Sequence, residues 1–236
     1  MAIKFSKNEI LEMIENAKFD IRSFYKQDFV NYAGKTKDSK EYYTEIIAEW
    51  LLSHVDLFNK IKLINREGSY RIESHDGKII NQESNRAEEK IAMKLFDYSQ
   101  NKGVTFDIIG KIIDYQTPLK NVQTDDVGKI DLLAYNENEK TLRILELKKP
   151  DSKETMLRCV LEAYTYLKIV DKTKLLKDFE LPEDTTIEAC PFVFLDGAQY
   201  QEMQQDRENL KDLIEKLGIE IIYLKEEKGE YVIIKE

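Results

Sequence analysis

Two stretches near the start of the chain carry apolar residues at helical spacing. In residues 7–26 the apolar positions Ile10, Ile14, Ala17 and Ile21 fall on one helical face. Ser6 is placed to cap the first turn of this helix. Residues 41–61 are denser in apolar side chains and contain neither proline nor glycine, which predicts a second, better buried helix. Residues 1–83 are therefore expected to form a mainly helical N-terminal extension.

The pattern changes after residue 61. Short alternating runs over residues 62–80, separated by turn candidates at 67–69 and 75–78, predict a small hairpin. Ser84 can cap a further helix, whose apolar face includes Ile91 and Leu95 and which ends near Gly103.

The remaining chain alternates between strand-length and helix-length segments. Strands are predicted over 106–115, 128–135, 141–149, 187–195, 219–224 and 231–234, and helices over 155–170 and 201–217. The short polar segment 136–140 makes the second and third strands antiparallel neighbours. This order predicts an α/β domain over residues 84–236, in which helices flank a mixed central β-sheet.

Three charged residues interrupt apolar strands. Asp131 stands in Ile130-Asp131-Leu132, and Glu146 and Lys148 alternate with Leu145 and Leu147. The two-residue period of a strand puts Glu146 and Lys148 on one face, and hairpin pairing brings Asp131 close to Glu146. Such charges are costly to bury unless they compensate one another or bind an ion.

Two carboxylates and a lysine at one place suit phosphodiester hydrolysis with a hard cation. Asp131, Glu146 and the backbone carbonyl of Leu147 offer oxygen ligands for Mg²⁺ or Mn²⁺. Lys148 can then orient or help deprotonate the attacking water and offset negative charge on the phosphate. The alternative is an ion-pair cluster on a half-solvated antiparallel sheet, which produces the same alternation.

This arrangement resembles the PD-(D/E)xK, or restriction-endonuclease-like, nuclease superfamily. The acid on one hairpin strand is Asp131, the acid-x-lysine motif on the next is Glu146-Leu147-Lys148, and Gly128 precedes the first acid, as is common in the family. Lys129-Ile130 stands where the family's name has proline. The resemblance implies an αβββαβ core and metal-dependent cleavage of DNA, with a further metal-binding acid on the preceding helix. That acid is Glu88, on the face of Ile91 and Leu95, or its neighbour Glu89.

Three further residues are candidates for contacting the substrate. Gln116, where the first core strand ends, resembles polar residues with which family members position water or substrate. Lys149 and Arg158 belong to a stretch after the motif that is richer in bases than the rest of the chain. Arg158 could instead form a surface ion pair with Glu162, four residues later.

Composition narrows the function further. A net charge of -9 argues against non-specific coating of nucleic acid but leaves room for a metal-dependent nuclease. No apolar run is long enough for a membrane helix and no signal segment opens the chain, so a cytoplasmic protein is expected. The two cysteines and two histidines cannot build a zinc cluster at the usual spacings. The competing hypothesis is a non-catalytic module that keeps the nuclease fold and binds nucleic acid, a protein partner or a second copy of itself.

Overall fold

The computed structural model describes residues 4–78 and 86–235. Its N-terminal part is helical, with α1 (Lys7–Ala17), the 3-10 helices η1 (Lys18–Lys26) and η2 (Asp28–Asn31), α2 (Tyr43–Ser53) and η3 (Val55–Lys60). The later helices are α3 (Ala87–Gln100), α4 (Met156–Ile169), α5 (Lys172–Asp178), α6 (Ala198–Met203) and α7 (Glu208–Leu217). The strands are β1 (Lys111–Pro118), β2 (Lys129–Asn136), β3 (Thr141–Leu147), β4 (Thr186–Phe194), β5 (Ile222–Glu227) and β6 (Glu230–Ile234).

All six strands form one mixed sheet in the order β1-β2-β3-β4-β5-β6. Strands β1, β2 and β3 are antiparallel neighbours, β4 and β5 run parallel to β3, and β6 returns antiparallel to β5. The predicted hairpin between β2 and β3 is present, with Leu132 opposite Leu145 and Asn136 opposite Thr141. The expected α/β class, with helices flanking a mixed central sheet, is therefore confirmed.

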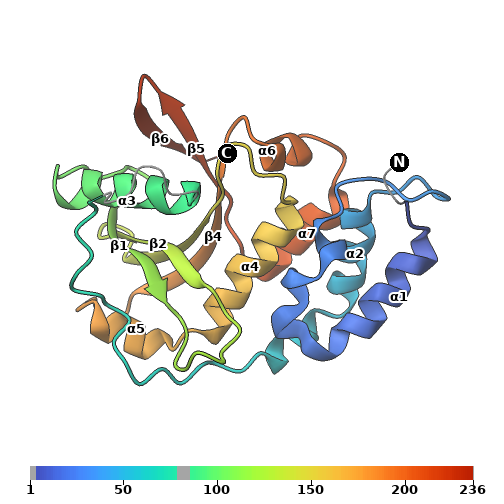
Figure 1. Cartoon of the computed structure of the whole chain (residues 1–236), viewed down its shortest axis with the longest axis horizontal. Helices are drawn as coiled ribbons and strands as arrows, with labels where there is room; N and C mark the ends of the chain where they lie inside the picture. The colour runs from blue at the N-terminus through green and yellow to red at the C-terminus, as the bar shows by residue number, and fades with distance from the viewer. Residues whose placement is uncertain (1–3, 79–85, 236) are drawn as a thin grey trace.

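Helices cover both faces of the sheet (Figure 1). Helix α3 lies on one face, where its Leu95 and Phe96 join a cluster with Leu145 of β3. Helix α4 lies on the other face, followed outward by α7, α2 and α1. Apolar residues of α1, α2 and η1 belong to the same buried cluster as Ile144 of β3 and Val160 of α4, so the N-terminal helices and the sheet share a core.

The two predicted N-terminal helices are shorter than expected. Helix α1 ends at Ala17, and η1 is broken at Asp20, whose backbone is non-helical and whose side chain accepts the Ser23 N–H. Helix α2 ends before His54, which stacks on Trp50 and bonds its carbonyl oxygen at 2.7 Å. Side-chain bonds to nearby backbone groups compete with the helical hydrogen bonds in both places.

Other boundaries also differ from the sequence prediction. The hairpin predicted over 62–80 is wrong for its described part, because residues 62–78 contain no strand. Strand β1 begins at Lys111, after a tight turn in which a Cβ on Gly110 would lie 2.1 Å from the Tyr135 carbonyl oxygen. The single helix predicted over 201–217 is two helices, and α5 was not predicted.

Two expectations from the sequence concern residues that the structure does not describe. Ser84, the predicted cap of α3, lies outside the described residues, as does the proposed domain boundary at 83 and 84, which stays a prediction. In residues 4–78 and 86–235 no helix is both long enough and apolar enough to cross a membrane.

Candidate active site

The β2–β3 hairpin brings the predicted charged residues together. Leu132 pairs with Leu145 at one end of the β2–β3 ladder. Asp131 and Glu146 are the next residues on the two strands, so both lie at that end of the hairpin. Beyond that pair, the Leu147 N–H donates to Asp131 Oδ2 at 2.9 Å instead of to a strand carbonyl. Strand alternation turns Asp131, Glu146 and Lys148 toward the α4 face, and this is the neighbourhood that the sequence predicted.

Lys148 is the centre of the group. Its side chain is 7% exposed, and Nζ lies 2.9 Å from Glu146 Oε1, 3.0 Å from Glu162 Oε2 and 3.1 Å from Glu154 Oε2. Burial alone would lower the pKa of Lys148, but the surrounding carboxylates outweigh it and raise that pKa well above its usual range. Lys148 is therefore a firmly held cation.

Ionising both motif carboxylates would give the site more negative charge than this lysine balances. Burial, followed by repulsion from Asp131 and Glu162, raises the pKa of Glu146 well above its ordinary value. Burial also raises the pKa of Asp131 to about 7, with Glu88 adding to the rise and Lys148 opposing it. Glu146 is 5% exposed, and its Oε2 has no hydrogen-bond partner among the described residues.

Gln116 lies on the neighbouring strand and touches the site. Its Nε2 donates to Asp131 Oδ1 at 2.9 Å, so Asp131 accepts one bond on each oxygen. Gln116 lies inside β1 and not beyond its end, and its φ of 50° is in the left-handed region that non-glycine residues rarely adopt. Strain of this kind is common at functional sites, where the surrounding structure enforces it.

The structure distinguishes the two acids at the start of α3. Glu88 Oε1 accepts the Lys149 N–H at 3.1 Å, which ties α3 to the chain just after the motif. Glu89 instead pairs with Arg86 at 3.1 Å. Glu88 is thus the acid that borders the site, and its role as a metal ligand stays a prediction.

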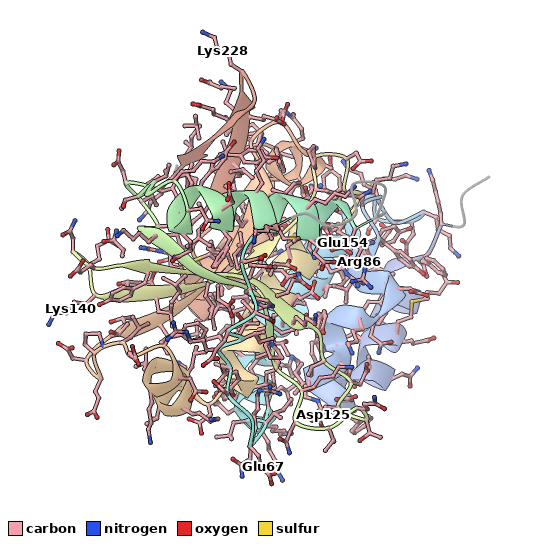
Figure 2. The ribbon with its side chains drawn as sticks, turned by 60° about the vertical axis from the view of Figure 1, so that its left-hand side comes forward. Glu67, Arg86, Asp125, Lys140, Glu154 and Lys228 are labelled. Carbon is pink, nitrogen blue, oxygen red and sulfur yellow. The ribbon has the colours of Figure 1, made fainter. Side chains whose placement is uncertain are left out.

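The predicted substrate contacts lie at the edge of the group. The Lys149 side chain is 41% exposed and pairs with Asp151 at 3.2 Å. Arg158 does not pair with Glu162; its Nε lies 3.3 Å from Glu154 Oε1, and Glu154 in turn contacts Lys148. Figure 2 shows Glu154 beneath the start of α3, near Arg86 in this view. Arg158 is therefore linked to the site through a shared carboxylate.

Helix α4 contributes residues that the motif alone does not reveal. Glu162 Oε1 accepts the Tyr166 hydroxyl at 3.0 Å, while its other oxygen holds Lys148. A Cβ on Gly128 would lie 2.2 Å from that hydroxyl, so Gly128 makes room for Tyr166 beside the first acid. Tyr25 of η1 meets the Tyr166 ring edge-on at 6.2 Å. The spacing of Glu162 and Tyr166, four apart on one helix face, was the available sequence signal.

The donor set fits a hard divalent cation. Carboxylates outnumber cations around it, with Glu88, Asp131, Glu146, Glu154 and Glu162 against Lys148 and Arg158. The free Oε2 of Glu146, the oxygens of Asp131 and the Leu147 carbonyl are the ligand types that Mg²⁺ and Mn²⁺ prefer.

A tighter cluster of potential ligands lies elsewhere. In the described part of the chain, three potential ligand atoms lie within 4.8 Å of one another on Glu188, Cys190 and Glu220. The acids of the motif do not come within that spacing of one another as a set of three. Arg143 Nε lies 3.4 Å from Glu188 and 3.5 Å from Glu220, so a cation already balances this cluster. Burial raises the pKa of the Cys190 thiol, which disfavours its thiolate as a ligand.

Comparisons with protein-family models, with curated proteins and with solved structures found no match to this chain. The functional argument therefore rests on the residues and their geometry.

Proposed function

We propose that this protein is a divalent-metal-dependent nuclease of the PD-(D/E)xK type that hydrolyses phosphodiester bonds in DNA. The observation that carries the proposal is the carboxylate pair of half-buried Asp131 and buried Glu146 beside Lys148 on the β2–β3 hairpin, with Oε2 of Glu146 without a hydrogen-bond partner among the described residues. Helix α3 before β1 and helix α4 after β3 follow the αβββαβ order of that superfamily, and the short helix α5 is an addition to it before β4.

Each group has a chemical role in this proposal. Asp131 and Glu146, with the Leu147 carbonyl, would hold Mg²⁺ or Mn²⁺, which supplies Lewis-acid polarisation of the phosphate and an activated water. Lys148, ringed by carboxylates, acts as a cation that orients water and offsets charge on the phosphate, in preference to acting as a base. Glu162 and Tyr166 position Lys148, and Gln116 orients Asp131.

The test is hydrolysis of single-stranded and duplex DNA, and of RNA, with Mg²⁺ or Mn²⁺. We expect Glu146→Gln, which keeps the shape of the side chain, to lower the rate at least about 100-fold, the scale of losing a group that stabilises transition-state charge. Glu188→Gln, in the Arg143 cluster, is the matched control and should keep the wild-type rate. Wild-type hydrolysis that survives Glu146→Gln would reject the proposed site.

A second candidate is a non-catalytic module with the same fold that binds nucleic acid or assembles with a protein. The wider spread of Glu88, Asp131 and Glu146, beyond the 4.8 Å spacing of a compact ligand set in the described residues, favours this alternative. It predicts no hydrolysis of any nucleic acid with either metal, together with full binding by the Glu146→Gln variant.

A further inference from the structure

A basic hollow opens on the N-terminal part of the molecule, away from the motif residues. It has a volume of about 350 Å³ and lies between the beginning of η1 and the end of η3. Four cationic side chains line it, Lys18, Arg22, Lys60 and Lys62, with Asp20 as the acid among its lining residues. The whole chain has 45 acids and 36 bases, so this concentration of positive charge departs from the average surface.

Two of these four cations, Lys60 and Lys62, are free to meet a ligand. Among residues 4–78 and 86–235, no ion pair involves Lys60 or Lys62, whereas Lys18 pairs closely with Glu15. Arg22 attracts the carboxylates of Asp125 and Asp126 and helps to lower their pKa values. Lys60 and Lys62 are exposed. Unpaired cations gathered at one hollow attract a polyanion, since each can replace a counterion at a phosphate.

An aromatic ring lies at the same hollow. Phe19 is 86% exposed, the largest exposure of any large hydrophobic side chain in the described part, and Lys18 Nζ lies 5.5 Å from its ring centre. The backbone break at Asp20 separates Phe19 from the buried face that continues with Ile21. Packing gives no reason for this exposed ring, while an aromatic face among cations is how single-stranded nucleic acids are bound without sequence preference.

We propose that this basic hollow is a binding site for single-stranded nucleic acid. A base stacks on Phe19, and the neighbouring phosphates contact Arg22, Lys60 and Lys62. The choice of ligand rests on the proposed nuclease function; the hollow and its charge do not. An acidic polypeptide would use the lysines but would have no need of the aromatic ring.

The hollow is connected to the candidate active site through one element. Helix η1 begins at Lys18 in the hollow and carries Tyr25, which contacts Tyr166 of the site at 6.2 Å between ring centres. Even a fully extended chain covers only about 3.6 Å per residue, so the seven steps from Lys18 to Tyr25 span at most about 25 Å. A strand of a few nucleotides therefore reaches from the hollow to the neighbourhood of Asp131 and Lys148.

The test is fluorescence anisotropy of a fluorescein-labelled oligothymidylate with the full chain, in EDTA so that no metal-dependent hydrolysis occurs. Phe19→Ala should weaken binding at least about fivefold, the lower end of one stacked base. A Lys60→Gln, Lys62→Gln variant should lower the slope of log affinity against log salt by about 1.4, or about 0.7 for each lost contact.

Matched controls lie on the β5–β6 hairpin. Lys228 lies at the top of Figure 2, opposite Glu67 and Asp125 at the bottom, and a Lys225→Gln, Lys228→Gln variant removes the same charge there. Val232→Ala removes another exposed apolar side chain, which is 41% exposed. Both controls should bind the oligonucleotide as the wild type does, and circular dichroism should show every variant folded.

The outcomes separate this inference from the proposed function. Wild-type affinity and salt slope in the hollow variants would overturn the inference, whether or not the protein is a nuclease. Displacement of the oligonucleotide by polyglutamate, combined with no effect of Phe19→Ala, would also overturn it and assign the hollow to acidic polypeptides. Binding that depends on Phe19 and the lysines in a protein without hydrolytic activity would support the hollow while rejecting the nuclease.

Discussion

Two buried cations near β3 have different surroundings. Arg143 and Lys148 have side chains only 5% and 7% exposed. The carboxylates that contact Arg143 are Glu139, Glu188 and Glu220, with side chains 51%, 36% and 24% exposed. Those that contact Lys148 are Glu146, Glu162 and Glu154, at 6%, 12% and 29%.

The difference shows why only one of these groups is a candidate metal site. Water solvates the acids around Arg143, so the guanidinium belongs to an ion-pair network at the protein surface. The acids around Lys148 are largely removed from water, and Asp131 and Glu88 add further negative charge. Excess carboxylate away from solvent is costly without a cation, and a divalent ion relieves it.

The two groups should differ most in stability when the central cation of each is removed. Lys148→Ala leaves buried carboxylates uncompensated and should cost about 3–5 kcal/mol of unfolding free energy at pH 8. Arg143→Ala leaves acids that water can reach and should cost less, about 1–2 kcal/mol. Urea unfolding monitored by circular dichroism measures both, and an equal loss in the two variants would remove the distinction.

Neutralising one acid in each group should change stability in opposite directions. The folded protein keeps a proton on Asp131 up to about pH 7, whereas the unfolded chain releases it near the usual value of 3.8. Stability of the metal-free protein from this group therefore falls as pH rises through that window. Asp131→Asn should therefore be about 1–3 kcal/mol more stable than the wild type at pH 8. A rise of about three pKa units corresponds to about 4 kcal/mol. Loss of the acceptor for the Leu147 N–H reduces this gain by about 1 kcal/mol.

The comparison variant is Glu188→Gln. It removes a partly exposed partner of Arg143 and should lower stability by no more than about 1 kcal/mol. Thermal unfolding of both variants between pH 4 and pH 8 is the measurement, and the gain in Asp131→Asn should vanish toward pH 4. A gain that persists unchanged at pH 4 would mean that the Asp131 charge is not its cause.

An effect of the same size as that of Asp131→Asn concerns the support of Lys148. A methyl group at Gly128 would meet the Tyr166 hydroxyl, so Gly128→Ala should displace Tyr166 from Glu162 at a cost of about 1–3 kcal/mol. At Gly34 the added Cβ meets Tyr43 at an ordinary 3.4 Å, so Gly34→Ala is the matched control. If Gly128→Ala lowers neither stability nor hydrolysis below that control, Tyr166 does not position the site.

The sequence was most informative where local periodicity determines structure. Alternation along β3 was enough to place Glu146 and Lys148 on one face, and the short turn to β2 added Asp131. Periodicity could not predict the contacts of Lys148 with Glu154 and Glu162, because they depend on how α4 and the segment before it lie against the sheet.

Helix boundaries failed for similar tertiary reasons. Helical spacing continues through 201–217, yet α6 ends at Met203 and α7 starts at Glu208. Between them Arg207 is 2% exposed and its guanidinium lies 3.2 Å from the ring centre of Tyr42, a contact with a residue far away in the sequence. The hairpin expected over 62–80 is absent from its described part, residues 62–78, because short polar alternation is also compatible with an extended loop.

Calorimetric titration with Mn²⁺ at pH 8 tests the central claim most directly. The wild type and a Glu188→Gln, Glu220→Gln variant should bind the ion, while an Asp131→Asn, Glu146→Gln variant should not, with circular dichroism showing all three folded. Because the ion displaces protons from the site acids, wild-type affinity should rise with pH through about 7, the pKa of Asp131. Undiminished binding by the Asp131→Asn, Glu146→Gln variant, or no binding by the wild type, would contradict the account.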